Sequence, residues 1–379
     1  MKINKSASEC CGCSACSMAC PVGAITMQAD AEGFLYPVVN ETVCVDCSMC
    51  VKACSFDKNY AKADGACEKS YYALVHRDAE IRRTSRSGGA FFAMAKAILA
   101  QGGVVYGVAL DDAFCAKTVR IASIEELPAL QGSKYVQSNK GDAFRRVRED
   151  LTAGLSVLFS GTGCEVSGLH SYLRLTNTDT ARLYTCDIVC HGVPSPLLWK
   201  DNVAYMEKKM KGKIDEVSFR DKRFGWRSHI ESYRSGKKIR YANRYTSIFY
   251  EHLSLRPSCG SCHFCNYDRC GDMTIADFWG VDSLQLPIAH EKGVSLLIIH
   301  TERGKELIHT VMAELDLFPT RKEDTKQPNF FSPSRLSPKR EQFWKGYEKK
   351  GYKRTTDSYY SVTDRLKLIY NCLLRRTSK

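Results

Sequence analysis

The chain has 379 residues, of which 44% are hydrophobic and 10% aromatic, so it can bury a core and is longer than one small domain needs. No stretch reaches the roughly 18 apolar residues of a membrane span, and the N-terminus M-K-I-N-K-S-A-S-E-C has no secretory apolar run. The net charge of +13 is uneven, because residues 1–70 carry six Lys against eight Asp or Glu. These features exclude a disordered chain and predict a cytoplasmic protein with an acidic head and a basic body.

Nine of the 19 cysteines lie within residues 10–54. In a reducing cytoplasm such clustering indicates metal binding rather than disulfides. Two runs repeat the C-x2-C-x2-C-x3-C spacing of bacterial ferredoxins, in which three cysteines wrap one cubane and the fourth reaches a second one. Tetrahedral zinc is the alternative, but its cysteine pairs usually stand roughly 15–20 residues apart. We therefore predict two 4Fe-4S clusters, one bound by Cys10, Cys13, Cys16 and Cys54 and one by Cys20, Cys44, Cys47 and Cys50.

After a linker near residues 55–70, the sequence predicts a strand over Tyr71–Val75 and a helix over Ala90–Ala100. Between them lies R-R-T-S-R-S-G-G, from Arg82 to Gly89. A glycine pair beside hydroxyls and guanidinium groups at a helix start suits a phosphate, because backbone N–H groups and the helix dipole favour anions there. A plain turn with solvated arginines is the alternative.

Alternating strands and helices then predict a larger α/β domain with a mixed sheet. The expected elements are strands over Val104–Leu110, Thr118–Ala122, Ser156–Ser160 and Arg182–Cys190, and a helix over Asp142–Leu151. Two of these strands run into turns, Gly161-Thr162-Gly163-Cys164 and His191-Gly192-Val193-Pro194. Open α/β sheets place ligands at such carboxyl ends, although the cysteines and His191 can equally be core residues.

An antiparallel meander is expected next, over Ile214–Arg220, His229–Arg234 and Lys237–Tyr241. The intervening D-K-R-F-G-W at Asp221–Trp226 mixes basic and aromatic residues, which suits a flavin, a nucleotide or a ribose phosphate. Nucleic acid is the rival ligand, but the chain has no nucleic-acid motif of the usual kinds.

A second cysteine group predicts a third iron–sulfur centre, with zinc or free thiols as alternatives. Its members are Cys259, Cys262, Cys265 and Cys270, and Cys164 or Cys190 can replace one or two of them. Further on, Tyr352–Lys379 reads as a basic amphipathic helix with Val362, Leu366, Ile369, Tyr370 and Leu373 at helical spacing. We expect it to pack against its own domain, and docking on a membrane surface is the alternative.

These motifs together resemble the beta subunit family of F420 hydrogenases and dehydrogenases over roughly residues 8–300. They are the ferredoxin head, R-S-G-G at Arg86–Gly89, G-S-K-Y at Gly132–Tyr135, the turn Gly161–Cys164, C-H-G-V-P-S at Cys190–Ser195, D-K-R-x-G-W at Asp221–Trp226, and Cys259–Gly280. The resemblance implies FAD (or FMN) and 4Fe-4S clusters that exchange electrons. Substrates vary within the family, from deazaflavin coenzymes and chlorophyll-type molecules to intermediates of polysaccharide biosynthesis. The sequence departs at Gly163, where the family usually has Pro.

The expected flavin or substrate pocket is lined by Ser87, Gly88, Gly89, Ser133, Lys134, Tyr135, Gly161 and Thr162. Lys134 is the candidate catalytic residue, because its charge would lie beside the flavin ring or its phosphates, and a solvated surface lysine is the alternative. The expected domains are a two-cluster, α+β ferredoxin-like head over residues 1–65, a flavin-binding α/β domain over residues 66–300, and a basic helical segment over residues 301–379.

Iron–sulfur clusters pass single electrons, whereas reduction of an organic substrate needs two, so a flavin is the expected converter. We expect electrons from a low-potential donor such as ferredoxin to pass through the clusters to the flavin and then to an anionic organic substrate. The basic body would steer that substrate or an acidic donor. The alternative is an electron-relay subunit without its own substrate site. An iron–sulfur sensor bound to nucleic acid is a third, weaker hypothesis.

Overall fold

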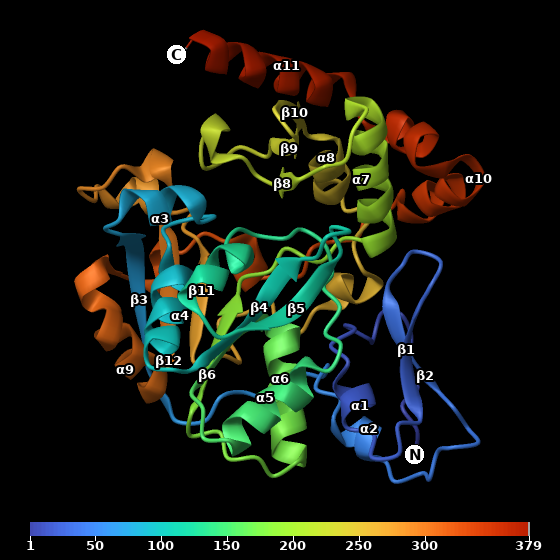
Figure 1. The fold of residues 1–379 in the computed structure, drawn as a ribbon, viewed down its shortest axis with the longest axis vertical. Coiled ribbons are helices and arrows are strands. Elements are labelled where there is room, and N and C mark those ends of the chain that lie inside the picture. The colour runs from blue at the N-terminus through green and yellow to red at the C-terminus, as the bar shows by residue number, and fades with distance from the viewer. Residues whose placement is uncertain (378–379) are drawn as a thin grey trace.

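The computed structural model describes residues 1–377 and is organised around one eight-stranded sheet (Figure 1). Its strands lie in the order β13 (Leu315–Thr320), β3 (Ala66–His76), β12 (Ser295–Thr301), β11 (Met273–Asp277), β7 (Leu183–Ile188), β6 (Val157–Thr162), β4 (Val104–Leu110) and β5 (Ala116–Ile121). From β11 to β4 the strands run parallel, whereas both flanks are antiparallel. The expected mixed α/β sheet is therefore confirmed.

Helices cover both faces of this sheet, because its strands bury side chains on both sides. Along β6, Val157 and Phe159 join one core cluster while Leu158 joins the other, which is the alternation of a pleated strand. On one face lie α4 (Ala90–Ala100) and α9 (Glu302–Val311), and on the other α5 (Ala143–Thr152) and α6 (Gly163–Leu175).

Most expected elements form where the sequence places them. The bounds of α4 and β4 agree with the expectation, and those of β5, α5, β6 and β7 differ by at most two residues. The expected meander forms a separate antiparallel sheet in the order β10 (Lys238–Ala242), β9 (Glu231–Ser235) and β8 (Glu216–Ser218). The strand expected over Tyr71–Val75 is longer, since β3 begins at Ala66, inside the expected linker.

The N-terminal head is small and lies beside α6 (Figure 1). It consists of two one-turn helices and a hairpin, namely α1 (Ala15–Met18), α2 (Met49–Lys52), β1 (Ile25–Ala29) and β2 (Leu35–Val39). Helix α6 approaches the head closely at Gly168, where an added Cβ would stand 2.9 Å from the Cys13 sulfur. Arg145 of α5 donates to the Met18 carbonyl at 3.0 Å.

The C-terminal part differs from the helical segment expected over residues 301–379. Strand β13 pairs with β3 at the sheet edge, because Leu315 and Leu317 complete the core beside α4 and α9. The body therefore continues past residue 300. Three helices enclose a separate core around Trp199, namely α7 (Pro196–Met210), α8 (Arg244–Tyr250) and α10 (Arg340–Tyr359).

Two breaks interrupt the C-terminal helical region. Gly351 has a φ of 69° and kinks α10, and α10 ends at Tyr359 before α11 (Val362–Thr377) begins. The single helix expected over Tyr352–Lys379 is thus two helices. No helix within residues 1–377 combines the length and apolar character needed to cross a membrane.

The remaining elements are short. They are the helix α3 (Ala79–Thr84) and the 3-10 helices η1 (Ile124–Leu130), η2 (Lys222–Phe224), η3 (Pro257–Ser261), η4 (Val281–Leu284), η5 (His290–Lys292), η6 (Met312–Glu314), η7 (Lys322–Asp324) and η8 (Pro328–Phe330). They lie in the connections between strands and helices.

Gly88 lies so close to the backbone of both β3 and β12 that there is no room for a side chain. An added Cβ would stand 2.1 Å from the Leu74 carbonyl oxygen and 2.7 Å from the Ser295 nitrogen. We predict that Gly88→Ala destabilises the fold by about 3 kcal/mol, because backbone atoms must move apart. Thermal unfolding checks this against Gly346→Ala, where the nearest atom is 3.6 Å away and no loss is expected. Equal midpoints for the two variants would contradict the packing argument.

Candidate functional site

The two ferredoxin runs fold in the same way. Ser14 and Ser48 both adopt the left-handed conformation, with φ values of 65° and 62°, and each precedes a four-residue helix. Each serine directly follows the second cysteine of its run and turns the chain, so that the third cysteine lies on the helix that follows. The sequence repeat is therefore also a repeat in three dimensions.

Four head cysteines, Cys10, Cys13, Cys16 and Cys54, form what we name the first head set. Burial raises the pKa of the Cys16 thiol, and Cys13, Cys10 and Cys54 add to the rise through their charges. Cys13 and Cys10 also raise the pKa of Cys54, which burial raises first, and Cys13 raises the pKa of Cys10 in addition to burial. Each of the six pairs among these four cysteines therefore interacts. The structure brings together the four cysteines that the spacing assigns to one cluster.

The other four, Cys20, Cys44, Cys47 and Cys50, form the second head set. All four line one cavity, together with apolar side chains such as Val22 and Ile25. The backbone N–H of Ala24 donates to the Cys20 sulfur at 3.2 Å. Cys20 thus leaves its own run and joins the three cysteines of the other run, as the interleaved ligand sets predict.

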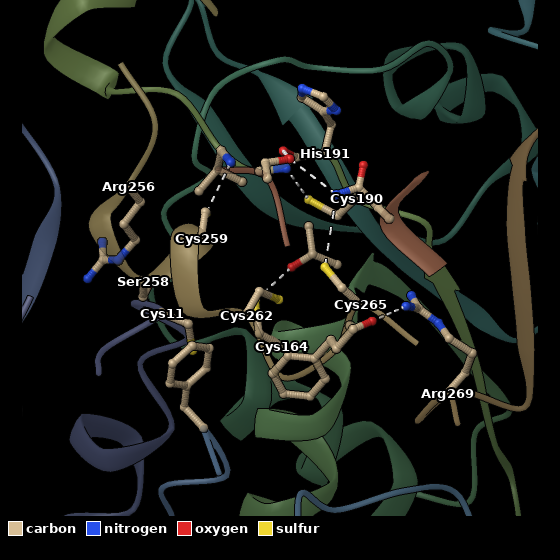
Figure 2. A pocket seen from close by; sticks show the side chains of 18 residues that line it. Cys11, Cys164, Cys190, His191, Arg256, Ser258, Cys259, Cys262, Cys265 and Arg269 are labelled. Atoms are coloured by element: carbon tan, nitrogen blue, oxygen red, sulfur yellow. Dashed lines mark hydrogen bonds between the residues drawn. The ribbon is translucent and has the colours of Figure 1, made fainter. Parts of the chain in front are cut away.

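A second cavity lies in the body, beyond the carboxyl ends of β6 and β7 (Figure 2). Figure 2 shows sulfur atoms that reach it from α6, from the turn after β7 and from η3. Its cysteines are Cys11, Cys164, Cys190, Cys259, Cys262 and Cys265. The turns that follow two neighbouring parallel strands therefore meet here, as expected for an open α/β sheet.

We name Cys164, Cys190, Cys259 and Cys262 the body set, because all six pairs among them interact. Burial raises the pKa of Cys190, and Cys259, Cys164 and Cys262 raise it further. Burial also raises the pKa of Cys259 to about 12, with added contributions from Cys262 and Cys164, and Cys164 acts on Cys262. Cys265 interacts with Cys262 and Cys190 of this set.

Backbone N–H groups point at two sulfurs of the body set. The N–H of Gly192 donates to Cys190 at 3.3 Å, and the N–H of Val193 donates to Cys259 at 3.4 Å. Gly192 has a φ of 115°, a conformation that favours glycine and brings both N–H groups inward. Such N–H···S bonds stabilise thiolates and tune the potentials of iron–sulfur clusters.

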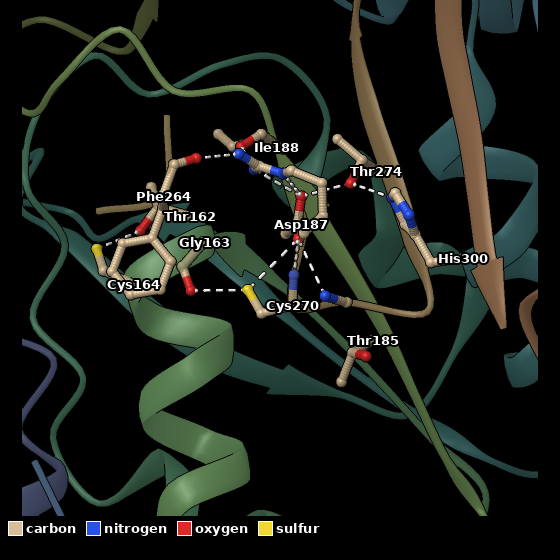
Figure 3. Close-up of polar contacts among 12 residues, drawn as sticks. Thr162, Gly163, Cys164, Thr185, Asp187, Ile188, Phe264, Cys270, Thr274 and His300 are labelled. Atoms are coloured by element: carbon tan, nitrogen blue, oxygen red, sulfur yellow. Dashed lines mark hydrogen bonds and ion pairs between the residues drawn. The ribbon is translucent and has the colours of Figure 1, made fainter. Parts of the chain in front are cut away.

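Cys270 lies outside the cavity, although the sequence places it in the third centre. Its sulfur donates to the Gly163 carbonyl at 3.0 Å and lies 3.5 Å from Asp187 (Figure 3). Asp187 accepts from Arg269 at 2.7 Å and from Thr274 at 2.8 Å. This buried network ties the chain after η3 to β7, so Cys270 lies where it can anchor the cysteine loop.

Single-ion sites were the alternative for all of these cysteines. Within residues 1–377, no group of three or more His, Cys, Asp or Glu side chains is arranged to hold one metal ion. A cubane binds each thiolate to a different iron, so its ligands stand further apart than those of one ion.

Cys11, which belongs to neither ferredoxin set, lies between the head and the body cavity. It is buried, it lines the body cavity, and its thiol interacts with both Cys13 and Cys164. The first head set and the body set are thus separated by one side chain. The sequence held no signal for this role, because the partner in the body is 153 positions away.

Arg256 is the second link between head and body. Its guanidinium is fully buried and donates to the Cys10 carbonyl at 2.7 Å, to the Leu35 carbonyl at 2.9 Å and to the Cys10 sulfur at 3.6 Å. It also bonds Gln137 at 2.8 Å and lies 4.1 Å from the centre of the Tyr36 ring. Arg256 lines the body cavity as well, so one cation serves both sites.

The expected flavin residues fall into two places. Gly161 and Thr162 end β6, and Thr162 lines the body cavity 3.1 Å from the Cys164 sulfur. Ser87 and Gly88 lie beside the start of β12. The Ser87 hydroxyl donates to the Val294 carbonyl, and the Gly88 N–H donates to the Ser295 hydroxyl. Gly89, with a φ of 98°, precedes the first residue of α4.

The loop with Ser133, Lys134 and Tyr135 lies beside the second of these places. Ser133 is half-buried. The Lys134 ammonium donates to the carbonyls of Ala129 and Gln131, both at 2.8 Å, and burial lowers its pKa to about 7. Its amine is held by its own loop. The Tyr135 side chain instead reaches beyond this loop, and its hydroxyl accepts from Arg220 at 3.2 Å.

Four residues join these loops, and we name them the arginine network: Arg86, Tyr135, Arg220 and Asp277. Sequence reasoning singled out Tyr135 and the segment that holds Arg86, but it missed Arg220 and Asp277. Asp277 accepts from Arg86 at 3.3 Å and from Arg220 at 3.1 Å, and Arg220 also donates to the Tyr135 hydroxyl at 3.2 Å. Both Nε and Nη1 of Arg86 are buried without a partner in residues 1–377. Buried donors normally have partners, so these two point to an anionic ligand. The R-S-G-G motif begins at Arg86, but only the fold shows the unpartnered donors of this side chain.

Aromatic side chains connect the arginine network to the body cavity. His191 lines the cavity and its ring centre lies 5.3 Å from that of Tyr250, which lies 4.3 Å from His229. Burial lowers the pKa of His191 to about 4 and that of His229 to about 3, so both are neutral at pH 7.

Two family models match the chain. The model for the C terminus of the coenzyme F420 hydrogenase/dehydrogenase beta subunit matches residues 154–323, and the model for a 4Fe-4S dicluster domain matches residues 9–58. The resemblance found in the sequence is thereby confirmed. The chain is an iron–sulfur electron-transfer protein related to that beta subunit.

Comparisons with individual proteins give weaker similarity than the two family models. No curated protein matches the chain. Among solved structures, a chain of the F420-reducing NiFe hydrogenase complex from Methanosarcina barkeri is 14% identical, with a TM-score of 0.48. That alignment covers 81% of this chain and 97% of the other.

Iron content can decide between Cys190 and Cys270 as a ligand. We predict that the protein purified without oxygen holds about twelve irons and that Cys190→Ser lowers this to about eight, since one of three 4Fe-4S clusters is lost. The matched control Cys270→Ser keeps about twelve, because its sulfur lies outside the cavity. Loss of iron from the control but not from Cys190→Ser would reverse the assignment.

The Arg256 side chain should influence the first head set electrostatically. In Arg256→Met, a cluster bound there loses a positive charge and an N–H···S bond, so its reduction potential should fall by on the order of 50 mV, or about 1 kcal/mol. An EPR-monitored redox titration measures this shift. Arg145→Met, which removes bonds to the Met18 and Ser17 carbonyls but none to a cysteine sulfur, is the control. An unchanged potential in Arg256→Met would refute the electrostatic role.

Proposed function

We propose that the protein is an iron–sulfur flavoprotein oxidoreductase. It would take electrons from a low-potential donor protein such as ferredoxin and reduce an anionic organic substrate, either a deazaflavin coenzyme or a biosynthetic intermediate. The observation that carries this proposal is the pair of buried donor atoms on Arg86, Nε and Nη1, that have no partner within residues 1–377.

The three cysteine sets would each hold one 4Fe-4S cluster. The head would then be a two-cluster domain of the ferredoxin type. When bound, the clusters supply single-electron transfer, and a flavin supplies the pairing of electrons for hydride transfer. Cys11 and Arg256 fix the head against the body, so the first head set and the body set stay at one separation.

The arginine network would hold the flavin, as FAD or FMN. Arg86 offers two charged donors, and Arg220, 6% exposed, presents its guanidinium 5.6 Å from the Trp279 ring centre. Charge-assisted bonds from arginine suit both flavin phosphates and the anionic form of a reduced ring. We assign anion binding to Arg86, which has free donors, in place of Lys134, whose amine already donates to two carbonyls.

Lys222 holds the chain on both sides of Arg86 in place. Its ammonium donates to the Arg82 carbonyl at 2.6 Å and to the Ser87 carbonyl at 2.9 Å. Burial lowers its pKa to about 7, and the charges of Arg86 and Arg82 add to that effect. An anion bound at Arg86 would oppose the effect of those charges, and Lys222 would then be more fully protonated at neutral pH.

The decisive experiment measures flavin as well as iron after purification without oxygen. We predict one FAD or FMN per chain, and Arg86→Met should bind it at least tenfold more weakly, because a charged buried donor is lost. The control Arg83→Met removes an exposed arginine three positions away that pairs with Glu80, and it should retain the flavin.

Iron content separates loss of the flavin from loss of the fold. Arg86→Met should keep the iron of the wild type, since no cysteine is changed. Wild-type protein that holds its iron but no flavin would overturn the reductase proposal and favour the relay subunit. Stoichiometric flavin in Arg86→Met would instead refute the arginine network as its site.

A further inference from the structure

The last helix, α11, presents an apolar face that its own domain leaves uncovered. Five large side chains on it are between 53% and 70% exposed. They are Val362, Leu366, Ile369, Tyr370 and Leu373. Their spacing places them on one side of a helix, so together they form a continuous strip, which we name the α11 stripe. We expected this face to pack inward, and the structure shows it exposed.

The opposite side of α11 is the one that attaches it to the body. Leu368 and Asn371 are half-buried there, and the helix lies beside β10 and η2. Asn243 donates to the Asp364 carbonyl at 2.9 Å and fixes the first turn. The orientation of the stripe therefore follows from contacts that the helix makes, and Figure 1 shows α11 as an outer element of the molecule, away from the head.

Basic side chains border the stripe on both sides. At about 100° per residue, Arg365 falls beside one edge and Lys367 beside the other. Both are exposed. The one acidic residue of the described helix, Asp364, falls on the far side and accepts from the Ser361 hydroxyl at 2.6 Å. The stripe thus combines apolar surface with a positive border.

We propose that α11 docks the protein on an anionic lipid surface. A helix that lies in a membrane interface needs an apolar face of this width, with Lys or Arg placed to reach the head groups beside it. Tyr370 stands at the edge of the stripe, where an amphipathic ring suits the interface. The net charge of +13 adds long-range attraction to an anionic surface. This inference stands apart from the proposed redox function.

Self-association through the same stripe is disfavoured by charge. A symmetric pair of stripes would place Arg365 and Lys367 of one copy against the same residues of the other, and the two chains also carry like net charges. An acidic protein groove would not meet this objection. It is the alternative that the experiment must separate from a lipid surface.

Vesicle binding by the full chain tests the proposal. We expect cosedimentation with vesicles of phosphatidylcholine that contain about 30% phosphatidylserine, and weak binding to phosphatidylcholine alone. The double variant Leu366→Ser with Ile369→Ser should bind at least tenfold more weakly, since two large side chains no longer leave water. The control Met312→Ser changes an exposed apolar residue away from α11 and should bind normally.

Two further readouts identify the contact. Arg365→Gln and Lys367→Gln should each weaken binding to the anionic vesicles about fivefold, because each loses one charge near the surface. In Tyr370→Trp, vesicles should shift the emission of the added tryptophan to the blue, relative to the wild type measured in parallel. That shift reports entry of the stripe itself.

Four outcomes would overturn the proposal. One is no binding to the anionic vesicles, and another is binding that survives the double variant. The third is a dimer without lipid that the double variant dissociates, since a second copy would then cover the stripe. Binding to vesicles with an unshifted Tyr370→Trp emission would also exclude α11 as the contact. Iron content equal to the wild type confirms that the variants are folded.

Discussion

The arrangement of the whole molecule depends on one buried cation, Arg256. Burying a guanidinium is costly unless its donors are satisfied, and here the carbonyls of Cys10 and Leu35 and the amide of Gln137 accept its bonds. Two of those groups belong to the head, and the arginine itself belongs to the body. The same bonds that satisfy the charge therefore attach the head, and they do so between two cysteine sets. A substitution of Arg256 would therefore change both the attachment of the head and the charge beside Cys10.

The sheet explains why the body cysteines meet at all. Strands β6 and β7 are parallel neighbours, so the turns that follow them emerge at one edge and deliver Cys164 and Cys190 there. The third contribution, from η3, is not delivered by a strand. It is fixed by the Asp187 network. Burial raises the pKa of this carboxyl, but Arg269, His300 and Thr274 together outweigh burial and hold that pKa below its usual range. A structural carboxylate thus positions a loop whose cysteines lie several residues away.

Local spacing in the sequence was enough for the head, because both ferredoxin runs carry their geometry within eleven residues. It also predicted α4, β4 and the meander, whose patterns are strong and regular. It was insufficient for the third site, where Cys270 looked equivalent to Cys259 and the fold turns it toward Gly163. Edge strand β13 and the open donors of Arg86 were missed for a related reason, since both depend on residues distant in the chain. Periodicity identified the apolar face of α11 but could not tell what, if anything, would cover it.

The cysteines of the head and those of the body set become available at different times during synthesis, because the head cysteines are close together in the sequence and the body cysteines are far apart. Every cysteine of the head has left the ribosome once residue 54 is free, so that region can acquire its iron while the body is still being translated. The body set is complete only after residue 262, and two of its members follow the paired strands β6 and β7. A ribosome paused between these points would carry a head able to hold metal and a body without a site. Assembly of the protein is in this sense ordered by its own primary structure.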